Sequence, residues 1–183
     1  FYTKFKFIPR VNDWLKESIH VVDAKFVDYD NDGDKDLFTL FTDVNNEGYR
    51  SFSILNNNGD GSFVDSNFRI EWNDTNFHNV GFKAIDIDKD GDKDLVFNAM
   101  NINGSNDEVF DEISNKLNLD DLVWENVNNS YIKYSTDVTI DIPNVKDIKW
   151  LKGVTVGDTF KFLAVQQVDQ LQGTFNLLEF YLK

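Results

Sequence analysis

One ten-residue pattern occurs twice and constrains the chain more than any other feature. Residues 28–37 read DYDNDGDKDL and residues 86–95 read DIDKDGDKDL, so both follow D-x-D-x-D-G-D-K-D-L. Five carboxylates this close repel one another by about 4 kcal/mol per pair at roughly 4 Å and an effective dielectric near 20. A bound divalent cation removes that repulsion, and glycine at the sixth position permits the sharp bend of a cation-binding loop. The pattern therefore predicts two metal-binding loops, because a solvated acidic turn requires neither the alternation nor the second copy.

The segments that flank both loops indicate strands rather than helices. Residues 24–27 and 37–41 flank the first loop, residues 83–85 and 95–97 flank the second, and all are rich in β-branched, aromatic and other apolar side chains. An EF-hand needs two helices and a bidentate Glu at the twelfth loop position, where the first copy has Thr39. The EF-hand is therefore excluded, and each loop is expected to connect two strands.

The ligands of the two loops are expected at alternate positions. Ca²⁺ takes six to eight oxygen ligands at about 2.3–2.6 Å. We predict side-chain ligands at the first, third, fifth and ninth positions and a backbone carbonyl at the seventh. The first predicted Ca²⁺ site comprises Asp28, Asp30, Asp32 and Asp36 with the carbonyl of Asp34, and the second comprises Asp86, Asp88, Asp90 and Asp94 with the carbonyl of Asp92.

The two loops, together with the segment NNNGDGSF at residues 56–63, resemble FG-GAP/VCBS repeats, which are the blades of integrin-alpha-type β-propellers. The resemblance is strongest over residues 20–100. It implies four-stranded antiparallel blades, each with a calcium site between its first two strands. FG-GAP-like propellers also accompany lectins and carbohydrate-active enzymes, so the resemblance implies a binding role toward protein or carbohydrate.

The repeat extends beyond the loops and divides the chain into unequal parts. His20 and His78 occupy equivalent positions in the two copies, as do Val22 and Val80. We expect one all-β domain over residues 1–183, built as a partial or open propeller of about three four-stranded antiparallel units. Its expected parts are a leading strand and connection at 1–19, calcium-binding blades at 20–77 and 78–140, and a degenerate blade at 141–183.

The second and third units are expected to depart from the pattern. A helical spacing of apolar residues predicts a short inserted helix over residues 105–120. Those apolar residues are Val109, Phe110, Ile113 and Leu117. In the third unit Gly157 aligns with the loop glycines, but the ligand positions hold Lys152, Val154 and Val156, which cannot bind Ca²⁺.

Composition limits the classes of partner and compartment. The formal net charge is −14 without a basic cluster, which argues against nucleic acid and anionic membranes. The chain has no cysteine and no apolar run of membrane-spanning length. It begins at Phe1 without a signal segment, which we interpret as a processed chain or an excised piece. Asp-only calcium loops suit millimolar calcium, so we predict an extracellular or cell-surface location.

Enzymatic motifs are sparse. A repeated histidine is typical of a structural rather than a catalytic residue, and neither G-x-S-x-G nor H-E-x-x-H occurs. Carboxylates outside the loops that a glycosidase could use are Glu71, Glu108, Asp111 and Glu125, but sequence spacing does not identify a catalytic pair among them. We therefore expect no enzymatic activity.

The expected function is a calcium-stabilised module that binds another protein. Carbohydrate binding is the alternative, through the side chains of Trp14, Trp72, Trp124 and Trp150. Trp124 and Trp150 lie in predicted strands, which favours the core, whereas Trp72 is expected in a connecting loop and is the better binding candidate. An architectural subunit is a further alternative, because open sheet edges favour self-association or a larger assembly.

Overall fold

The computed structural model contains only β-strands and turns in the part of the chain that it describes. That part comprises residues 19–43, 45, 49–73, 77–101, 110–111, 116–118, 122–134, 139–141, 148–169 and 173–181. Within it no helix is long and apolar enough to cross a membrane. The chain divides into two compact units, residues 1–73 and 74–183. The predicted leading strand at 1–9 and Trp14 lie outside the described residues.

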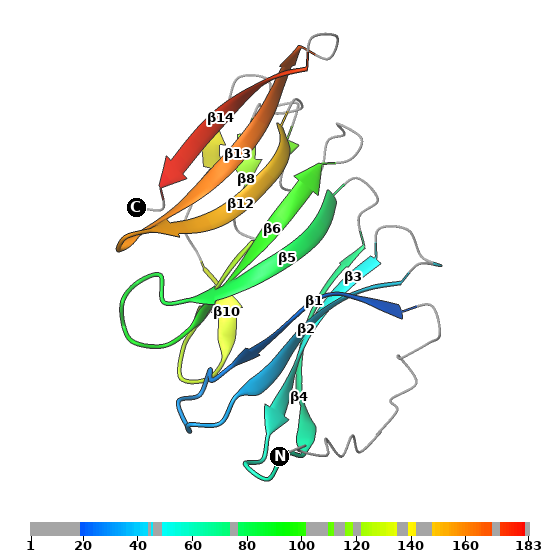
Figure 1. The fold of residues 1–183 in the computed structure, drawn as a ribbon, viewed down its shortest axis with the longest axis vertical. Helices are drawn as coiled ribbons and strands as arrows, with labels where there is room; N and C mark the ends of the chain where they lie inside the picture. Colours follow the sequence, from blue (N-terminus) through cyan, green and yellow to red (C-terminus); the bar gives the residue numbers. More distant parts are fainter. Residues whose placement is uncertain are drawn as a thin grey trace. The chain divides into compact units, whose positions relative to one another are not determined.

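The first unit is a four-stranded antiparallel sheet whose strands follow chain order (Figure 1). Its strands are β1 (Ile19–Val27), β2 (Asp36–Asp43), β3 (Tyr49–Asn57) and β4 (Phe63–Asn73). Turn-forming Asp, Asn and Gly residues separate the strands, which favours neighbouring antiparallel pairing. This sheet has the four-stranded meander that the sequence predicts for the first calcium-binding unit.

Aromatic side chains fill the core of the first unit. Phe38 on β2 packs between Tyr29 and Phe52, with ring centroids 5.6 Å apart in both pairs. Phe52 also contacts Phe68 edge-on at 6.4 Å. Full burial of each such ring stabilises the fold by about 1.5–3 kcal/mol. Because Tyr29 is the second residue of the first acidic loop, this core fixes the loop to the sheet.

The second unit contains a seven-stranded antiparallel sheet and a three-stranded sheet. The larger sheet is formed by β5 (Phe77–Ile85), β6 (Asp94–Asn101), β9 (Val123–Asn126), β10 (Tyr131–Lys133), β12 (Ile148–Val156), β13 (Thr159–Asp169) and β14 (Thr174–Tyr181). The smaller sheet is formed by β7 (Phe110–Asp111), β8 (Lys116–Asn118) and β11 (Thr139–Asp141). The all-β prediction is confirmed, and the described strands form no closed sheet.

The larger sheet branches at β6. One edge of β6 pairs with β5 along its length, while the other pairs with β9 at residues 95–96 and with β12 at residues 99–100. Between these two neighbours, the side-chain carbonyl of Asn98 accepts a hydrogen bond of 3.2 Å from the backbone N–H of Gly153. The strands β5, β6, β9 and β10 thus form a second meander. The strands β12, β13 and β14 extend the sheet from the C-terminal half of β6, where β12 pairs with it (Figure 1).

The two meanders share a backbone irregularity outside the loops. The pairing of β1 with β2 skips Val22, and the pairing of β5 with β6 skips Val80. An extra residue in one strand of an antiparallel pair is a β-bulge, which bends and twists that strand. His20 and His78 lie at the same register beyond each bulge. The structural repeat therefore includes the first two strands of each unit as well as the loops.

The predicted inserted helix is wrong at the residues that the structure describes. Phe110 pairs with Leu117, and Asp111 pairs with Lys116, so β7 and β8 form a hairpin to which β11 adds a third strand. The apolar spacing that suggested a helix covers few turns, and such short patterns do not distinguish helix from strand. In this segment the backbone N–H and C=O groups pair between strands. The other residues of 105–120 lie outside the described part.

In the predicted degenerate blade, the described residues 152–158 form the end of a strand and a tight turn in place of a loop. Lys152, Val154 and Val156, which the sequence alignment places at ligand positions, belong to the continuous strand β12. The chain then reverses at Gly157 and Asp158, and Val156 pairs with Thr159. Gly157 has φ 60°, as the first central residue of a tight hairpin turn requires. The shared Gly-Asp sequence therefore forms a two-residue turn here, and β12, β13 and β14 extend the sheet of the second unit.

Candidate metal centres

The two acidic loops connect equivalent strands and share one backbone conformation. The first joins β1 to β2, and the second joins β5 to β6. The fourth residue has positive φ in both loops, 59° at Asn31 and 69° at Lys89. The sixth is the glycine, with φ 94° at Gly33 and 106° at Gly91. Two left-handed residues in each loop turn the intervening carboxylates toward a common centre.

Hydrogen bonds within each loop hold the same turns. The backbone N–H of Asp34 donates to the Asp32 carboxylate at 2.8 Å, and that of Asp92 donates to Asp90 at 3.0 Å. Two residues earlier in each loop, the backbone N–H of the fifth residue donates to the carboxylate of the third residue. This distance is 3.3 Å in the first loop and 3.2 Å in the second. Such local hydrogen bonds hold the accepting carboxylates close to the backbone of their own loop.

Each loop brings three carboxylates together. One oxygen from each carboxylate of a group lies within 4.8 Å of the others. The first acidic cluster is Asp28, Asp30 and Asp32, and the second acidic cluster is Asp86, Asp88 and Asp94. Of the eight predicted side-chain ligands, Asp36 and Asp90 lie outside these two groups. The described residues thus contain two acidic clusters that could hold metal ions.

Carboxylate oxygens in and beside both clusters are buried without a hydrogen-bond donor. They are Oδ1 of Asp28, Oδ2 of Asp36, Oδ1 of Asp86 and Oδ1 of Asp92. A buried carboxylate oxygen without a donor costs free energy, and native proteins satisfy nearly all such atoms. A cation supplies the missing interaction for several oxygens at once. The residues of both loops therefore fit a bound divalent metal ion.

The ninth residue connects each loop to the third strand of its sheet. Asp36 and Asp94 are almost fully buried, with 2% and 1% of their surface exposed. Asp36 accepts a hydrogen bond from the backbone of Asn57 at 2.9 Å, and Asp94 accepts one from Asn126 at 3.0 Å. Asn57 ends β3 and Asn126 ends β9. The ninth aspartate therefore joins the loop to a strand that follows much later in the sequence.

A tyrosine fixes each loop from a different direction. In the first loop the Tyr29 hydroxyl donates to the side chain of Asn56 at 3.2 Å. In the second, Ile87 replaces this tyrosine, and the hydroxyl of Tyr131 on β10 donates to the carbonyl of Lys93 at 2.7 Å. Neither these tyrosines nor the asparagine backbones at the strand ends were predicted from the sequence. Tyr29 stands inside the repeated pattern, but no local sequence signal connects Tyr131 to Lys93.

Burial and neighbouring charge raise the pKa of aspartates in the second loop. Burial raises the pKa of Asp94 to about 6, against hydrogen bonds from Ile87 and Asn126 that lower it. Burial and the carboxylate of Asp90 raise the pKa of Asp92 to about 6. In the first loop, burial likewise raises the pKa of Asp36. These shifts mean that the carboxylates of the folded, metal-free loops bind protons more tightly than free aspartates do. A bound cation would displace those protons.

The pH dependence of metal-free stability follows from these shifts. Asp92 and Asp94 bind protons more tightly in the folded chain, where each pKa is about 6, than in the unfolded chain, where the reference value is 3.8. Their stabilising contribution is complete below about pH 4 and is lost as pH rises through about 6. We expect the Tm of metal-stripped protein to fall over this interval, and Asp94→Asn to flatten the decrease. An unchanged slope in Asp94→Asn, measured by thermal unfolding, would contradict the raised pKa of Asp94.

Lys89 is less suited than Asn31 to the left-handed backbone conformation that both residues adopt at the fourth loop position. A lysine at φ 69° carries a conformational cost that asparagine, present at Asn31 with φ 59°, largely avoids. We expect Lys89→Asn to stabilise the protein by about 0.5–1 kcal/mol, and the reciprocal Asn31→Lys to destabilise it by a similar amount. Urea unfolding midpoints in calcium measure both effects. Equal and opposite shifts are the expected result, and a loss of stability in Lys89→Asn would contradict the assignment of strain.

The other residues considered for chemistry do not gather into a described site. His20 lies exposed on β1. Glu71 is exposed on β4 and accepts a hydrogen bond from Tyr49 at 3.1 Å, while Glu125 is partly buried on β9. Asp111 pairs with Lys116 in the small sheet, and Glu108 lies outside the described residues. The two acidic loops remain the candidate functional sites of the described part.

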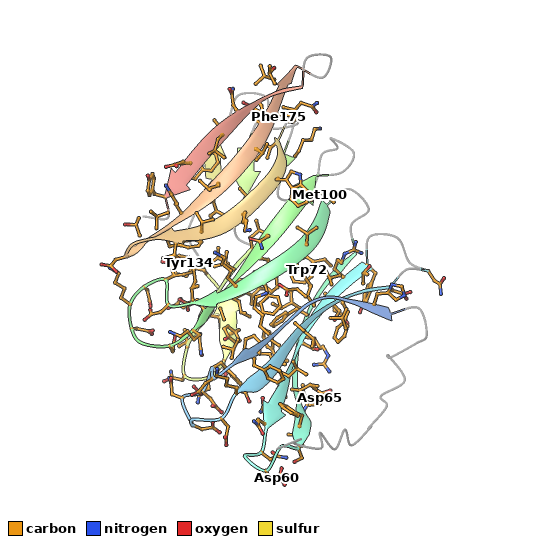
Figure 2. The ribbon with its side chains drawn as sticks, viewed as in Figure 1. Asp60, Asp65, Trp72, Met100, Tyr134 and Phe175 are labelled. Carbon is orange, nitrogen blue, oxygen red and sulfur yellow. The ribbon has the colours of Figure 1, made fainter. Side chains whose placement is uncertain are left out.

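The tryptophans lie differently from the sequence prediction. Trp150 was expected in the core, yet 46% of its surface is exposed on β12. Trp124 is partly buried on β9, and the ammonium of Lys133 lies 5.9 Å from the centre of its ring. Trp72 was expected in a loop but lies partly buried on β4, paired with Arg50 (labelled in Figure 2). Strand alternation places one face of β12 toward solvent, which sequence periodicity did not reveal at this position.

Comparison with known proteins supports the repeat that the loops and the bulges indicate. A family model described as an FG-GAP-like repeat matches residues 28–97, which include both acidic loops and all of β2, β3, β4 and β5. The comparisons with curated proteins and with solved structures found no match. Residues 28–97 are therefore an FG-GAP-like repeat segment of an all-β protein.

Proposed function

We propose that both acidic loops bind Ca²⁺ and that the ions stabilise a protein-interaction module. The observation that carries this proposal is the set of buried carboxylate oxygens in both loops that have no hydrogen-bond donor. In each loop, oxygens of three carboxylates also lie within 4.8 Å of one another. The FG-GAP-like match over the same loops supports calcium as the ion. The ligands proposed in each loop are the aspartates at the first, third, fifth and ninth positions, with the carbonyl of the seventh.

The donor set favours calcium over other divalent ions. The chain has no cysteine, and the clusters supply carboxylate oxygens alone, whereas zinc prefers sulfur and nitrogen. Mg²⁺ requires a near-ideal octahedron and keeps several waters, whereas a loop with many carboxylates can give Ca²⁺ its larger coordination number. The proposed role of the ion is structural, since it neutralises carboxylates that otherwise repel one another.

The interaction role is proposed from charge, sheet edges and family. A net charge of −14 disfavours nucleic acid and anionic membranes as partners. In the described part, β1 and β4 are the edge strands of the four-stranded sheet, and β5, β10 and β14 are edge strands of the seven-stranded sheet. Such edges accept additional strands. We propose a non-enzymatic, propeller-type module that works outside the cell or at its surface, where calcium is abundant. Its partner is another protein or another subunit of a larger assembly.

Calcium-dependent stability tests the proposal. Each site should add about 1.4 kcal/mol when free calcium is tenfold above its dissociation constant. We expect Asp32→Ala and Asp90→Ala each to lower the Tm by several degrees in millimolar calcium, at roughly 2–4 °C per kcal/mol for a chain of this size. In a chelator both variants should resemble the parent, since the two carboxylates lie exposed in the loops. A calcium-dependent Tm shift that survives in the double variant would contradict the ligand assignment.

Carbohydrate binding is the second candidate, and the exposed side of Trp150 favours it. An exposed tryptophan beside polar residues can stack on a sugar ring, and 46% of Trp150 is exposed next to exposed Lys152. A glycan array probed with the parent chain, Trp150→Ala and Trp72→Ala distinguishes the two functions. Binding lost only in Trp150→Ala supports the carbohydrate role, and no glycan signal for the parent chain excludes it on that array.

A further inference from the structure

The hairpin β9–β10 has a short connection to the rest of its sheet. β9 pairs with β6 at two positions, where Leu95 lies opposite Trp124 and Val96 lies opposite Val123, and one further backbone bond of 2.8 Å joins Phe97 to Leu122. β10 pairs with β9 at three positions and ends the sheet. In the first unit the equivalent strand β3 pairs with β2 at six positions, from Leu37 to Thr42. Backbone pairing alone therefore holds β9–β10 less firmly than it holds β3.

Two hydrogen bonds from the second acidic loop supplement this short pairing. The Asp94 carboxylate accepts the backbone N–H of Asn126 at 3.0 Å, and the carbonyl of Lys93 accepts the hydroxyl of Tyr131 at 2.7 Å. Asp94, Asn126 and Tyr131 are all buried, with 1%, 0% and 6% of their surfaces exposed. Bonds to a buried, charged group are about twice as strong as neutral ones. The two bonds thus come from adjacent residues of this loop.

The residue that anchors the hairpin also belongs to the second acidic cluster. Oxygens of Asp94, Asp86 and Asp88 lie within 4.8 Å of one another, so without a cation their charges push the Asp94 carboxylate away from its position. In the first unit Asp36 likewise accepts the backbone N–H of Asn57, but β3 is also held by six paired positions with β2. Cation binding should therefore act on the third strand more strongly in the second unit than in the first.

We infer that the cation in the second acidic cluster controls the docking of the β9–β10 hairpin onto β6. With the ion bound, the Asp94 carboxylate keeps its position and its hydrogen bond to the backbone of Asn126 holds the hairpin against the loop. Without the ion, the hairpin opens locally while the rest of the sheet remains folded. The surface thereby controlled includes Ile132, which is 50% exposed, and Trp124 with Lys133 against its ring. This inference rests on the proposed binding of calcium and adds to it a calcium-dependent surface.

Hydrogen exchange of the full chain, followed by mass spectrometry with calcium and after chelation, tests the inference. Chelation should speed exchange in peptides covering residues 122–134 at least about tenfold, which corresponds to about 1.4 kcal/mol of lost protection. Peptides covering β3, residues 49–57, should change less, because its six-residue pairing with β2 does not depend on the cluster. Equal changes in both segments would overturn the inference, since they would mean general rather than local loosening.

Matched variants separate the hairpin effect from a general loss of folding. In calcium, Asp94→Asn should reproduce the fast exchange of residues 122–134, whereas the equivalent Asp36→Asn should leave that segment unchanged. Tyr131→Phe removes only the hydroxyl bond to Lys93 and should speed exchange of the same segment a few-fold. If neither Asp94→Asn nor Tyr131→Phe changes the segment, the inference is wrong.

Calorimetry with calcium keeps this inference distinct from the proposed function. If calcium binds but the exchange of residues 122–134 does not respond to it, the hairpin inference fails and calcium binding stands. If no calcium binds, both fail. If calcium binds and chelation speeds hydrogen exchange in residues 122–134 more than in β3, the hairpin is a calcium-controlled element.

Discussion

Replacing Asp94 by alanine should destabilise the protein more than any other single change in the two loops. In calcium it removes a ligand of the second cluster and leaves the backbone N–H groups of Ile87 and Asn126, which donate at 2.7 and 3.0 Å, without their acceptor. Each buried donor without a partner costs about 1–3 kcal/mol. With the lost ion, the expected decrease in unfolding free energy is about 3–8 kcal/mol. Urea unfolding in millimolar calcium measures it.

Asp90→Ala is the matched control for this prediction. Asp90 is exposed and accepts a bond from the N–H of Asp92 within the same loop, at 3.0 Å. Its loss should therefore cost the calcium contribution of about 1–2 kcal/mol and little more. After chelation, Asp94→Ala should remain destabilised and Asp90→Ala should not. Equal losses for the two variants would show that Asp94 has no structural role beyond binding the ion.

Gly153→Ala should destabilise the protein by overpacking the interior of the larger sheet. A Cβ at this position would lie 2.6 Å from Cγ1 of Val96 and 3.0 Å from the ring of Phe160. Val96 is fully buried on β6 and β-branched, so it cannot move aside by a simple rotation. Overpacking of this kind costs about 1–3 kcal/mol. Thermal or urea unfolding of Gly153→Ala beside Lys152→Ala, an exposed neighbour, measures the loss.

A second substitution distinguishes overpacking from a backbone effect. Val96→Ala removes the methyl group that the new Cβ would meet, at the cost of a cavity. In the double variant Gly153→Ala/Val96→Ala, the combined loss should therefore be smaller than the sum of the two single losses. Strict additivity would show that Gly153 is required for another reason, such as the contact of the new Cβ with the ring of Phe160.

The loops and the first two strands of each unit could be predicted because their information is local. Alternating carboxylates and one glycine specify a cation loop within ten residues, and the flanking apolar alternation specifies the strands. The equivalent positions of Val22 and Val80 also have a structural counterpart, since both are the bulged residues of their strands. Such features need no knowledge of distant segments.

The branched sheet could not be predicted because it depends on contacts distant in sequence. Nothing near β6 indicates that β9 and β12 share one of its edges, and the close approach of Gly153 to Val96 appears only when the strands are paired. The alignment of Gly157 with the loop glycines was misleading for the same reason, since a Gly-Asp pair suits a hairpin turn as well as a cation loop. The bond between Asp94 and Asn126 likewise joins residues on either side of a long insertion.

Isothermal titration of the metal-stripped chain with calcium tests the central claim most directly. The account predicts two calcium ions per chain, one ion in Asp32→Ala or Asp90→Ala, and much weaker heats with magnesium under the same conditions. Two ions for the parent and one for each variant would assign one ion to each loop. No binding at millimolar calcium, or an unchanged stoichiometry in both variants, would contradict the account.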